Sequence, residues 1–457
     1  MHIVASYKEI DRVAAKSHHA KALVGVSVSL GNMATVTGLD NGLKIILKPI
    51  PEATAVSVWV GYRIGSRNER PGMTGSTHWV EHMLFKGGGR LKKGDVDKLV
   101  SRLGGQYNAF TDTDFTAYFE TVPADAIDTA LFIEAERMRN AAFDQKEFEA
   151  ERTVVISERE GAENMPEFLL EEELWSTAFH IHPYHWLPIG WKQDLQKLER
   201  DTMYAHYLRY YAPNNAVMTI VGNFEQAATM QKIRERFGGF KPEQPPDPMT
   251  LKEPPQMGER RAVIRKPGSV NHVEIGWHAL EFGHEDTPKI AMLSAILGGW
   301  RGYNPFSMGE WRPRSNRLYK ALVETKLATD VSCRSEVKID PGLFVAHAAV
   351  KTGVAVEKVE KILLKEVDKL CAKPPTKGEM EIARTQIHAW SGFENDGVTF
   401  QGLLTTFFEM AGGFENYSKV ISVVDRVTPR DVQAVAKKYL TENNRTVVHF
   451  LAQETKA

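Results

Sequence analysis

The 457-residue chain contains one pentapeptide whose residue types and spacing suit metal chemistry, His78-Trp79-Val80-Glu81-His82. On a helix, residues three and four positions apart lie on the same face. His78 and His82 can therefore bind one ion, with Glu81 toward the same side. A hydrolytic zinc site uses three His or carboxylate ligands and leaves one position for water. The H-x-x-E-H pentapeptide supplies two imidazoles and a carboxylate that can take the water's proton, and it needs one further ligand.

The alternative interpretation is that both histidines are ordinary core or surface residues. A five-residue match of this kind arises by chance in roughly a few per cent of chains this long. Val80, Met83 and Leu84 give the segment an apolar helical face, and the glycines at 87–89 predict where the helix stops. Because burying unpaired polar side chains is costly, a bound metal explains a histidine pair on such a helix.

Length and composition predict an ordinary globular protein with more than one domain. The formal net charge of −1 gives no overall attraction to nucleic acid or anionic membranes. No run of 18 or more apolar residues exists, so no transmembrane helix is expected. Two cysteines, Cys333 and Cys371, exclude a disulfide framework and a cysteine-based zinc finger. The weakly apolar residues 22–30 make a poor signal peptide, which leaves periplasm and cytoplasm both open.

Two halves of the chain resemble each other. Three pairs of segments match at a nearly constant offset of 232, 230 and 229 residues: 146–153 with 378–385, 200–201 with 430–431, and Tyr210 with Tyr439. A constant offset at separated places indicates an internal duplication.

A proline-rich polar stretch over residues 241–255 is incompatible with a helix or a central strand. We expect this stretch to be the linker between a zinc-binding catalytic domain over 35–240 and a homologous metal-free domain over 256–457. An N-terminal extension over 1–34 would precede them.

Hydrophobic patterning predicts the fold class. Strands are expected at 43–47, 56–62, 115–121, 217–221, 262–264, 273–277, 342–350 and 446–450, and helices at 127–142, 146–160, 356–370 and 429–439. Strand pairs interleaved with helices predict an α+β fold of two duplicated α/β sandwich domains with mostly antiparallel sheets. In the second half, the apolar segment 290–297 precedes a glycine pair as the pentapeptide does, but it has no histidine or glutamate. The metal is therefore expected in the first half.

A second acidic position lies downstream on a predicted helix. Glu151 and Glu158 are seven residues apart, or two helical turns, and share a face. The alternative is a solvated acidic helix, because Glu147, Glu149 and Glu160 are close in sequence.

H-x-x-E-H, followed after 75 residues by Glu158 within E-R-x-V-V-x-x-E, resembles the pitrilysin family of inverzincin zinc metallopeptidases. The likeness is to the branch that contains mitochondrial processing peptidase and its bacterial relatives. It covers nearly the whole chain, with further matching segments at 40–43, 85–87, 104–105, 108–111, 182–184 and 211–215.

The resemblance implies one Zn²⁺ per chain, bound by His78, His82 and Glu158, with water in the fourth position. Glu81 would be the general base of peptide hydrolysis. Glu151 would orient a ligand histidine.

Substrate binding is implied at Asn108, Ala109 and Phe110, where the family has an edge strand. An extended peptide adds to such an edge through main-chain hydrogen bonds, which predicts cleavage of unfolded or flexible segments.

In the family's complete peptidases, an Arg and a Tyr of the second half hold substrate near the zinc. The resemblance places Val323 and Thr329 at these positions, and neither can replace them. Arg312 and Tyr319 have the right separation but straddle Pro313, which interrupts a helix. A heterodimer is therefore implied, in which a homologous metal-free subunit supplies the clamp across a closed chamber.

Two other interpretations stay open. Respiratory-complex core proteins share the family's fold and are mainly structural, so a non-catalytic structural or assembly role is the alternative to peptidase activity. His180, His182 and His185 form a second histidine cluster, but Pro183 and Pro188 prevent one helix from aligning them. A packed loop is favoured there over a second metal.

Overall fold

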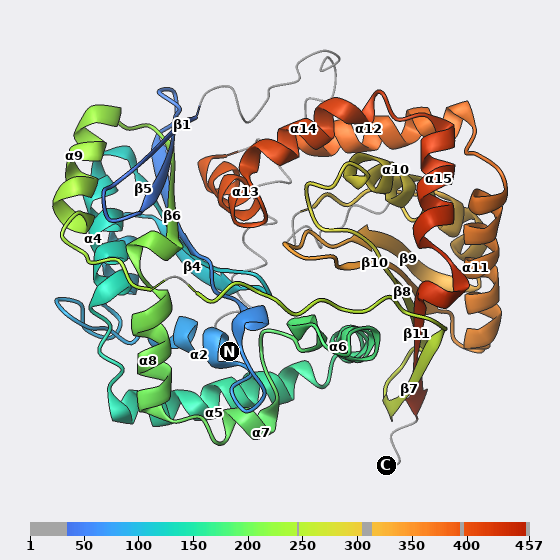
Figure 1. The fold of residues 1–457 in the computed structure, drawn as a ribbon, viewed down its shortest axis with the longest axis horizontal. Coiled ribbons are helices and arrows are strands. Elements are labelled where there is room, and N and C mark those ends of the chain that lie inside the picture. Colours follow the sequence, from blue (N-terminus) through green and yellow to red (C-terminus); the bar gives the residue numbers. More distant parts are fainter. Residues whose placement is uncertain (1–33, 245, 304–312, 394–396, 454–457) are drawn as a thin grey trace.

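The computed structural model describes residues 34–244, 246–303, 313–393 and 397–453. The expected N-terminal extension, apart from Ala34, lies outside the described residues, and so does Arg312. Two halves lie side by side, each built on one sheet, and the linker crosses between them (Figure 1). Residues 241–244 and 246–255 form no helix or strand.

The first half forms a six-stranded sheet in the order β1-β2-β6-β3-β5-β4. All neighbours pair antiparallel except β2 and β6, which are parallel. The strands are β1 (Thr35–Gly38), β2 (Lys44–Pro49), β3 (Ala55–Tyr62), β4 (Gln106–Thr111), β5 (Thr116–Pro123) and β6 (Ala216–Gly222).

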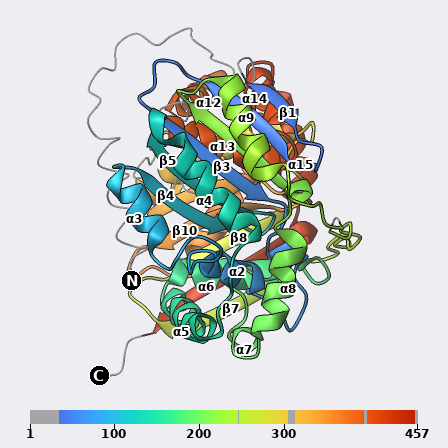
Figure 2. The same ribbon diagram turned by 90° about the vertical axis from the view of Figure 1, so that its left-hand side faces the viewer.

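Helices of the first half cover one face of this sheet or extend below it (Figure 2). They are α2 (Ser76–Met83), α3 (Asp95–Arg102), α4 (Ile127–Arg139), α5 (Gln145–Ala162), α7 (Lys192–Leu195), α8 (Arg200–Tyr210) and α9 (Gln226–Phe237). Helix α4 packs on β3 and β5 and supports α9, while α2 packs between α5 and β4.

The second half repeats the plan with a five-stranded sheet in the order β7-β11-β8-β10-β9. Only β7 and β11 are parallel. The strands are β7 (Arg260–Pro267), β8 (His272–His278), β9 (Ala328–Ser335), β10 (Leu343–Val350) and β11 (Arg445–Gln453). The predicted α+β class with two sandwich domains and mostly antiparallel sheets is confirmed.

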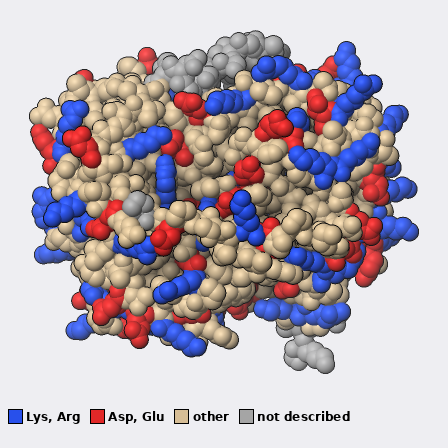
Figure 3. All heavy atoms as spheres, viewed as in Figure 1, with Lys and Arg blue, Asp and Glu red and all other residues tan. Residues whose placement is uncertain are grey.

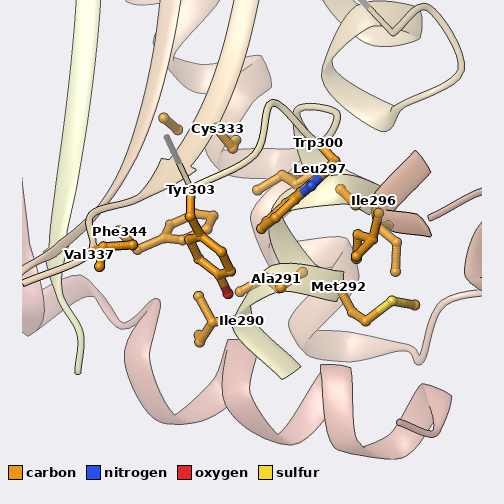
Figure 4. Packing of buried hydrophobic residues seen from close by; sticks show 14 of the residues in the cluster. Ile290, Ala291, Met292, Ile296, Leu297, Trp300, Tyr303, Cys333, Val337 and Phe344 are labelled. Atoms are coloured by element: carbon orange, nitrogen blue, oxygen red, sulfur yellow. The ribbon is translucent and has the colours of Figure 1, made fainter. Parts of the chain in front are cut away.

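Helices α10 (Thr287–Leu297) and α11 (Val356–Ala372) pack against the second sheet. Outside them lie α12 (Lys377–Phe393), α14 (Phe414–Val424) and α15 (Pro429–Tyr439). Every described residue of α10 except Lys289 is buried. Figure 4 shows side chains of α10 packed among Trp300, Tyr303 and Phe344 of β10, with Tyr303 next to Phe344. This apolar burial on all sides explains why the helix has no room for polar metal ligands.

One helix from each half packs on the sheet of the other half (Figure 1). Helix α6 (Pro166–Ala178) belongs to the first half but packs on β7, β8 and β11. Helix α13 (Val398–Met410), at the same offset of 232 residues, packs on β3 and β6. The exchange joins Ile46, Trp59, Phe115, Ala117 and Val217 of the first half to the core of the second half.

The face of the molecule seen in Figure 3 carries no dominant charge. Lysine and arginine side chains intermix with aspartate and glutamate over the face seen in Figure 3, as a net charge of −1 predicts. No helix within the described part of the chain is long and apolar enough to cross a membrane.

Candidate metal centre

The pentapeptide lies on α2, which begins at Ser76 and ends at Met83. Glu69 caps its first turn by accepting the backbone N–H groups of Gly75 at 2.8 Å and Thr77 at 2.7 Å, and so satisfies donors that a helix leaves unpaired. Trp79, Val80 and Met83 are fully buried. This apolar anchoring turns the two histidines toward α5.

The helix ends earlier than the expected glycine stop at 87–89, so that expectation was wrong. The glycines lie in the turn that follows, where Gly88 lies against backbone atoms of Asn140 and Ala141. A Cβ at Gly88 would lie 2.1 Å from the Asn140 carbonyl oxygen. The requirement for glycine here is close approach, not helix termination.

Glu158 on α5 faces both histidines. Its Oε2 lies 3.4 Å from Nε2 of His82 and 3.8 Å from Nε2 of His78. Tetrahedral ligands that each lie 2.0–2.2 Å from zinc are about 3.4 Å apart, so these separations suit one ion. Within the described ranges, these three residues form the one group of His, Cys, Asp or Glu with metal-binding geometry.

A buried acceptor without a donor supports this fit. Oε2 of Glu158 is buried and accepts no hydrogen bond, and Nδ1 of His78 is buried without a partner. A cation between the imidazoles would satisfy the carboxylate oxygen. Two imidazoles and one carboxylate are the donor set that hydrolytic Zn²⁺ sites use.

Glu151 contacts His82 at Nδ1, the ring nitrogen that does not face Glu158. Its Oε1 lies 2.8 Å from Nδ1 of His82, and its Oε2 lies 2.5 Å from Nζ of Lys86. With Nδ1 engaged, Nε2 of His82 is the nitrogen that faces the site. Lys86 has no counterpart among the expected site residues, because sequence spacing alone does not reveal that it reaches Glu151.

Glu81 is 9% exposed, and burial raises its pKa to about 7. Its Oε2 accepts a 2.6 Å hydrogen bond from the Thr111 hydroxyl. A pKa near neutrality suits a group that takes and returns a proton.

The two histidines differ in basicity. Burial and the neighbouring His82 lower the pKa of His78 to about 4. Burial also acts to lower the pKa of His82, but the hydrogen bond to Glu151 and the nearby Glu158 carboxylate outweigh it and raise that pKa to about 10. A metal at Nε2 of His82 therefore has to displace a proton.

Asn108, Ala109 and Phe110 lie on β4, at the edge of the first sheet beside α2. β4 pairs with β5 and is the last strand of this sheet in the described part of the chain. Such an edge can accept an extended peptide as a further strand.

The residues at the expected clamp positions, Val323 and Thr329, do not have the side-chain groups of an Arg and a Tyr. Val323 ends a π-helical turn (Tyr319–Val323), and Thr329 lies in β9. Tyr319, the second member of the competing pair, packs partly buried against the second-half core.

The second histidine cluster forms a packed loop. His182 Nε2 lies 3.1 Å from Asp340 Oδ2, and residues Pro183–His185 form a 3₁₀ turn. The metal-binding geometry found at α2 does not recur at these histidines or elsewhere among the residues that the structure describes.

Comparison with known proteins gives the family. Residues 44–186 match the family model described as Insulinase (Peptidase family M16), and residues 197–387 match the Peptidase M16 inactive domain. Zinc protease PqqE of Helicobacter pylori is 31% identical over 386 residues, which cover 83% of this chain and 82% of that protein. The mitochondrial-processing peptidase subunit beta of Lentinula edodes is 23% identical over 444 residues, 96% of this chain and 94% of that protein.

A solved structure agrees with these matches. The crystal structure of a protease from Helicobacter pylori has a TM-score of 0.85 and 28% identity, and the match covers 91% of this chain and 99% of that one. The match of residues 197–387, which include α10, to an inactive domain accords with the absence of histidine and glutamate from α10. The chain therefore belongs to peptidase family M16, the pitrilysin family, with likeness to its mitochondrial processing peptidase branch, as the sequence pattern predicted.

Proposed function

We propose that this chain is a Zn²⁺-dependent endopeptidase that cleaves unfolded or extended peptides. One observation carries the proposal: His78, His82 and Glu158 bring ligand atoms within 4.8 Å of one another, with Glu81 on the same helix as the two histidines. Relatives named zinc proteases support it.

The residues divide the chemistry among them. Bound at His78, His82 and Glu158, Zn²⁺ would act as a Lewis acid and lower the pKa of water. Glu81 takes the proton of that water and delivers it to the leaving amine. β4 holds the substrate in an extended conformation beside α2.

Replacing Glu81 by Gln tests this function. We expect Glu81→Gln to bind one equivalent of zinc like the wild type and to lose peptide hydrolysis, because the amide cannot accept the proton. Glu160→Gln, at a side chain 51% exposed on α5, is the matched control and should be as active as the wild type. Hydrolysis at the wild-type rate by zinc-loaded Glu81→Gln would exclude the catalytic role and favour the structural alternative.

A second subunit belongs to the proposal. The positions of Val323 and Thr329 lack the clamp side chains, and a similar relative is named as a subunit. We infer that a homologous metal-free chain closes the chamber and supplies an Arg/Tyr clamp. Purification from the native source should yield a stoichiometric companion that raises activity. Full, saturable activity of the purified chain alone, as a monomer or homodimer, would contradict this part.

A further inference from the structure

The metal-free half contacts the first half beside the general base. Between β4 and β5, residues 112–115 form a tight turn closed by a 2.8 Å hydrogen bond from the Asp112 N–H to the Phe115 carbonyl. This turn follows Thr111, the residue whose hydroxyl donates to Glu81 at 2.6 Å. The position of the turn therefore fixes where the Thr111 hydroxyl points.

Lys338, which follows β9, binds this turn from the other half of the chain. Its Nζ lies 3.0 Å from Oδ1 of Asp112 and donates at 2.7 Å to the Thr113 hydroxyl. The next residue, Ile339, donates its backbone N–H to Oδ2 of Asp114 at 2.9 Å. Lys338 is 6% exposed, and a buried ammonium group requires such partners.

Residues of the first half also contact this turn. The Arg67 backbone N–H donates to the Thr113 carbonyl at 2.9 Å, and the Tyr184 hydroxyl donates to Oδ1 of Asp114 at 2.7 Å. A Cβ at Gly65 would lie 2.4 Å from the Thr113 carbonyl oxygen. The turn thus lies against both Gly65 and Lys338.

Thr111 has few alternatives for its hydroxyl. It pairs with Thr116 across the hairpin, and the Thr116 hydroxyl lies 3.3 Å from it while also donating to the Ile64 carbonyl at 3.0 Å. Since the single Thr116 proton is donated to the Ile64 carbonyl, the Thr111 hydroxyl donates its own proton to Glu81. The contact orients one oxygen of Glu81 and leaves the other for substrate and water.

We propose that Thr111 and Lys338 are positioning residues for Glu81, and that the metal-free half contributes to the active site through Lys338. Lys338 fixes the turn, the turn fixes Thr111, and Thr111 orients the Glu81 carboxylate. This inference rests on the proposed peptidase function.

Kinetics of four variants test the chain of contacts. Thr111→Val keeps the branched shape without the hydroxyl, and Lys338→Met keeps the length without the charge. Each should lower kcat about 10- to 100-fold with KM and zinc stoichiometry unchanged, and Thr111→Ser should restore most of the rate. Lys44→Met is the control, because Lys44 also joins the halves, at 2.7 Å to Glu409, far from the hairpin in the strand order; its kcat should equal that of the wild type.

The double variant distinguishes this mechanism from a general destabilisation of the contact between the two halves. Because Lys338 acts through Thr111, Thr111→Val with Lys338→Met should lose no more activity than the stronger single variant. Multiplicative losses, an effect on KM alone, or an equal loss in Lys44→Met would overturn the proposal.

Hydrogen exchange gives a readout independent of activity. Amides of residues 106–118 should exchange faster in Lys338→Met than in the wild type or Lys44→Met, with or without added zinc. Unchanged exchange would overturn the role of Lys338 even in an active enzyme. Absence of zinc-dependent hydrolysis in the wild type would instead contradict the proposed function, so the two failures are distinguishable.

Discussion

Oε1 of Glu151 lies 2.8 Å from Nδ1 of His82, and Lys86 binds the other oxygen of the same carboxylate at 2.5 Å. The arrangement places a fixed charge behind one imidazole and leaves its Nε2 facing Glu158 at 3.4 Å. Carboxylates in this position increase the basicity of a ligand histidine and fix its ring.

Glu151→Gln should therefore weaken zinc binding about 10- to 100-fold, because the amide carries no charge and Lys86 loses its partner. Competition with a chromophoric chelator measures the affinity. Glu149→Gln, whose side chain is 51% exposed on the same helix, should bind zinc like the wild type. Equal affinities of the two variants would show that Glu151 does not act through His82.

Removing zinc should lower the thermal midpoint of unfolding. A ligand that binds only the folded state stabilises it by about 2.7 kcal/mol when present at 100 times its Kd. Differential scanning fluorimetry with chelator, and then with zinc restored, measures the shift. Glu158→Gln should lose most of it, since that variant lacks one of three ligands. A shift of the same size in Glu158→Gln would place the bound zinc elsewhere.

Stability should fall in acid because of His206. This side chain is 8% exposed and contacts the Thr77 hydroxyl at 3.4 Å, and burial, with Arg209 nearby, lowers its pKa to about 4. The unfolded state, with a pKa of about 6.5, takes up the proton first. The contribution of His206 is thus complete above pH 6.5 and is lost as the pH falls toward 4.

The loss amounts to about 2 kcal/mol at pH 5. Urea unfolding at pH 7 and pH 5 measures it, and His206→Gln should show a smaller difference between the two pH values than the wild type. Equal differences in both proteins would exclude His206 as the titrating group.

Gly402 of the exchanged helix α13 lies against Trp59 of β3. A Cβ at Gly402 would lie 2.4 Å from the indole ring, so Gly402→Ala should destabilise the protein by about 1–3 kcal/mol through overpacking. Gly161→Ala is the matched control, because a Cβ there meets nothing within 4 Å, and it should stabilise α5 by up to about 1 kcal/mol. Urea midpoints compare the two; stabilisation by both would show that α13 does not pack closely on Trp59.

Much of the fold was predictable from local patterns. Helix α15 spans Pro429–Tyr439 as expected, and α5 spans Gln145–Ala162 where 146–160 was predicted, because caps and apolar spacing are local signals. Strands β1, β4 and β9 were absent from the pattern-based prediction. Each lies at an edge of its sheet in the described part of the chain. β1 and β4 bury none of their residues, so their sequences lack the apolar face that marks a strand.

The site was predictable in part. The spacing of the pentapeptide predicted the two histidine ligands, whereas Glu158 was predicted from the resemblance of this chain to the pitrilysin family. The contacts of Thr111 and Lys338 depend on how a hairpin meets the other half of the chain. Helices α6 and α13 were not predicted, and helix patterning would not show which sheet each one covers.

The exchange of α6 and α13 also sets an order of events on the ribosome. Strand β6 ends at Gly222, and α13 begins about 180 residues later at Val398. At roughly 5–20 residues per second, this interval lasts on the order of 10–40 s. Throughout that time the emerging N-terminal sheet has no α13 over Trp59, so this half cannot complete its core until residues 398–410 have been synthesised.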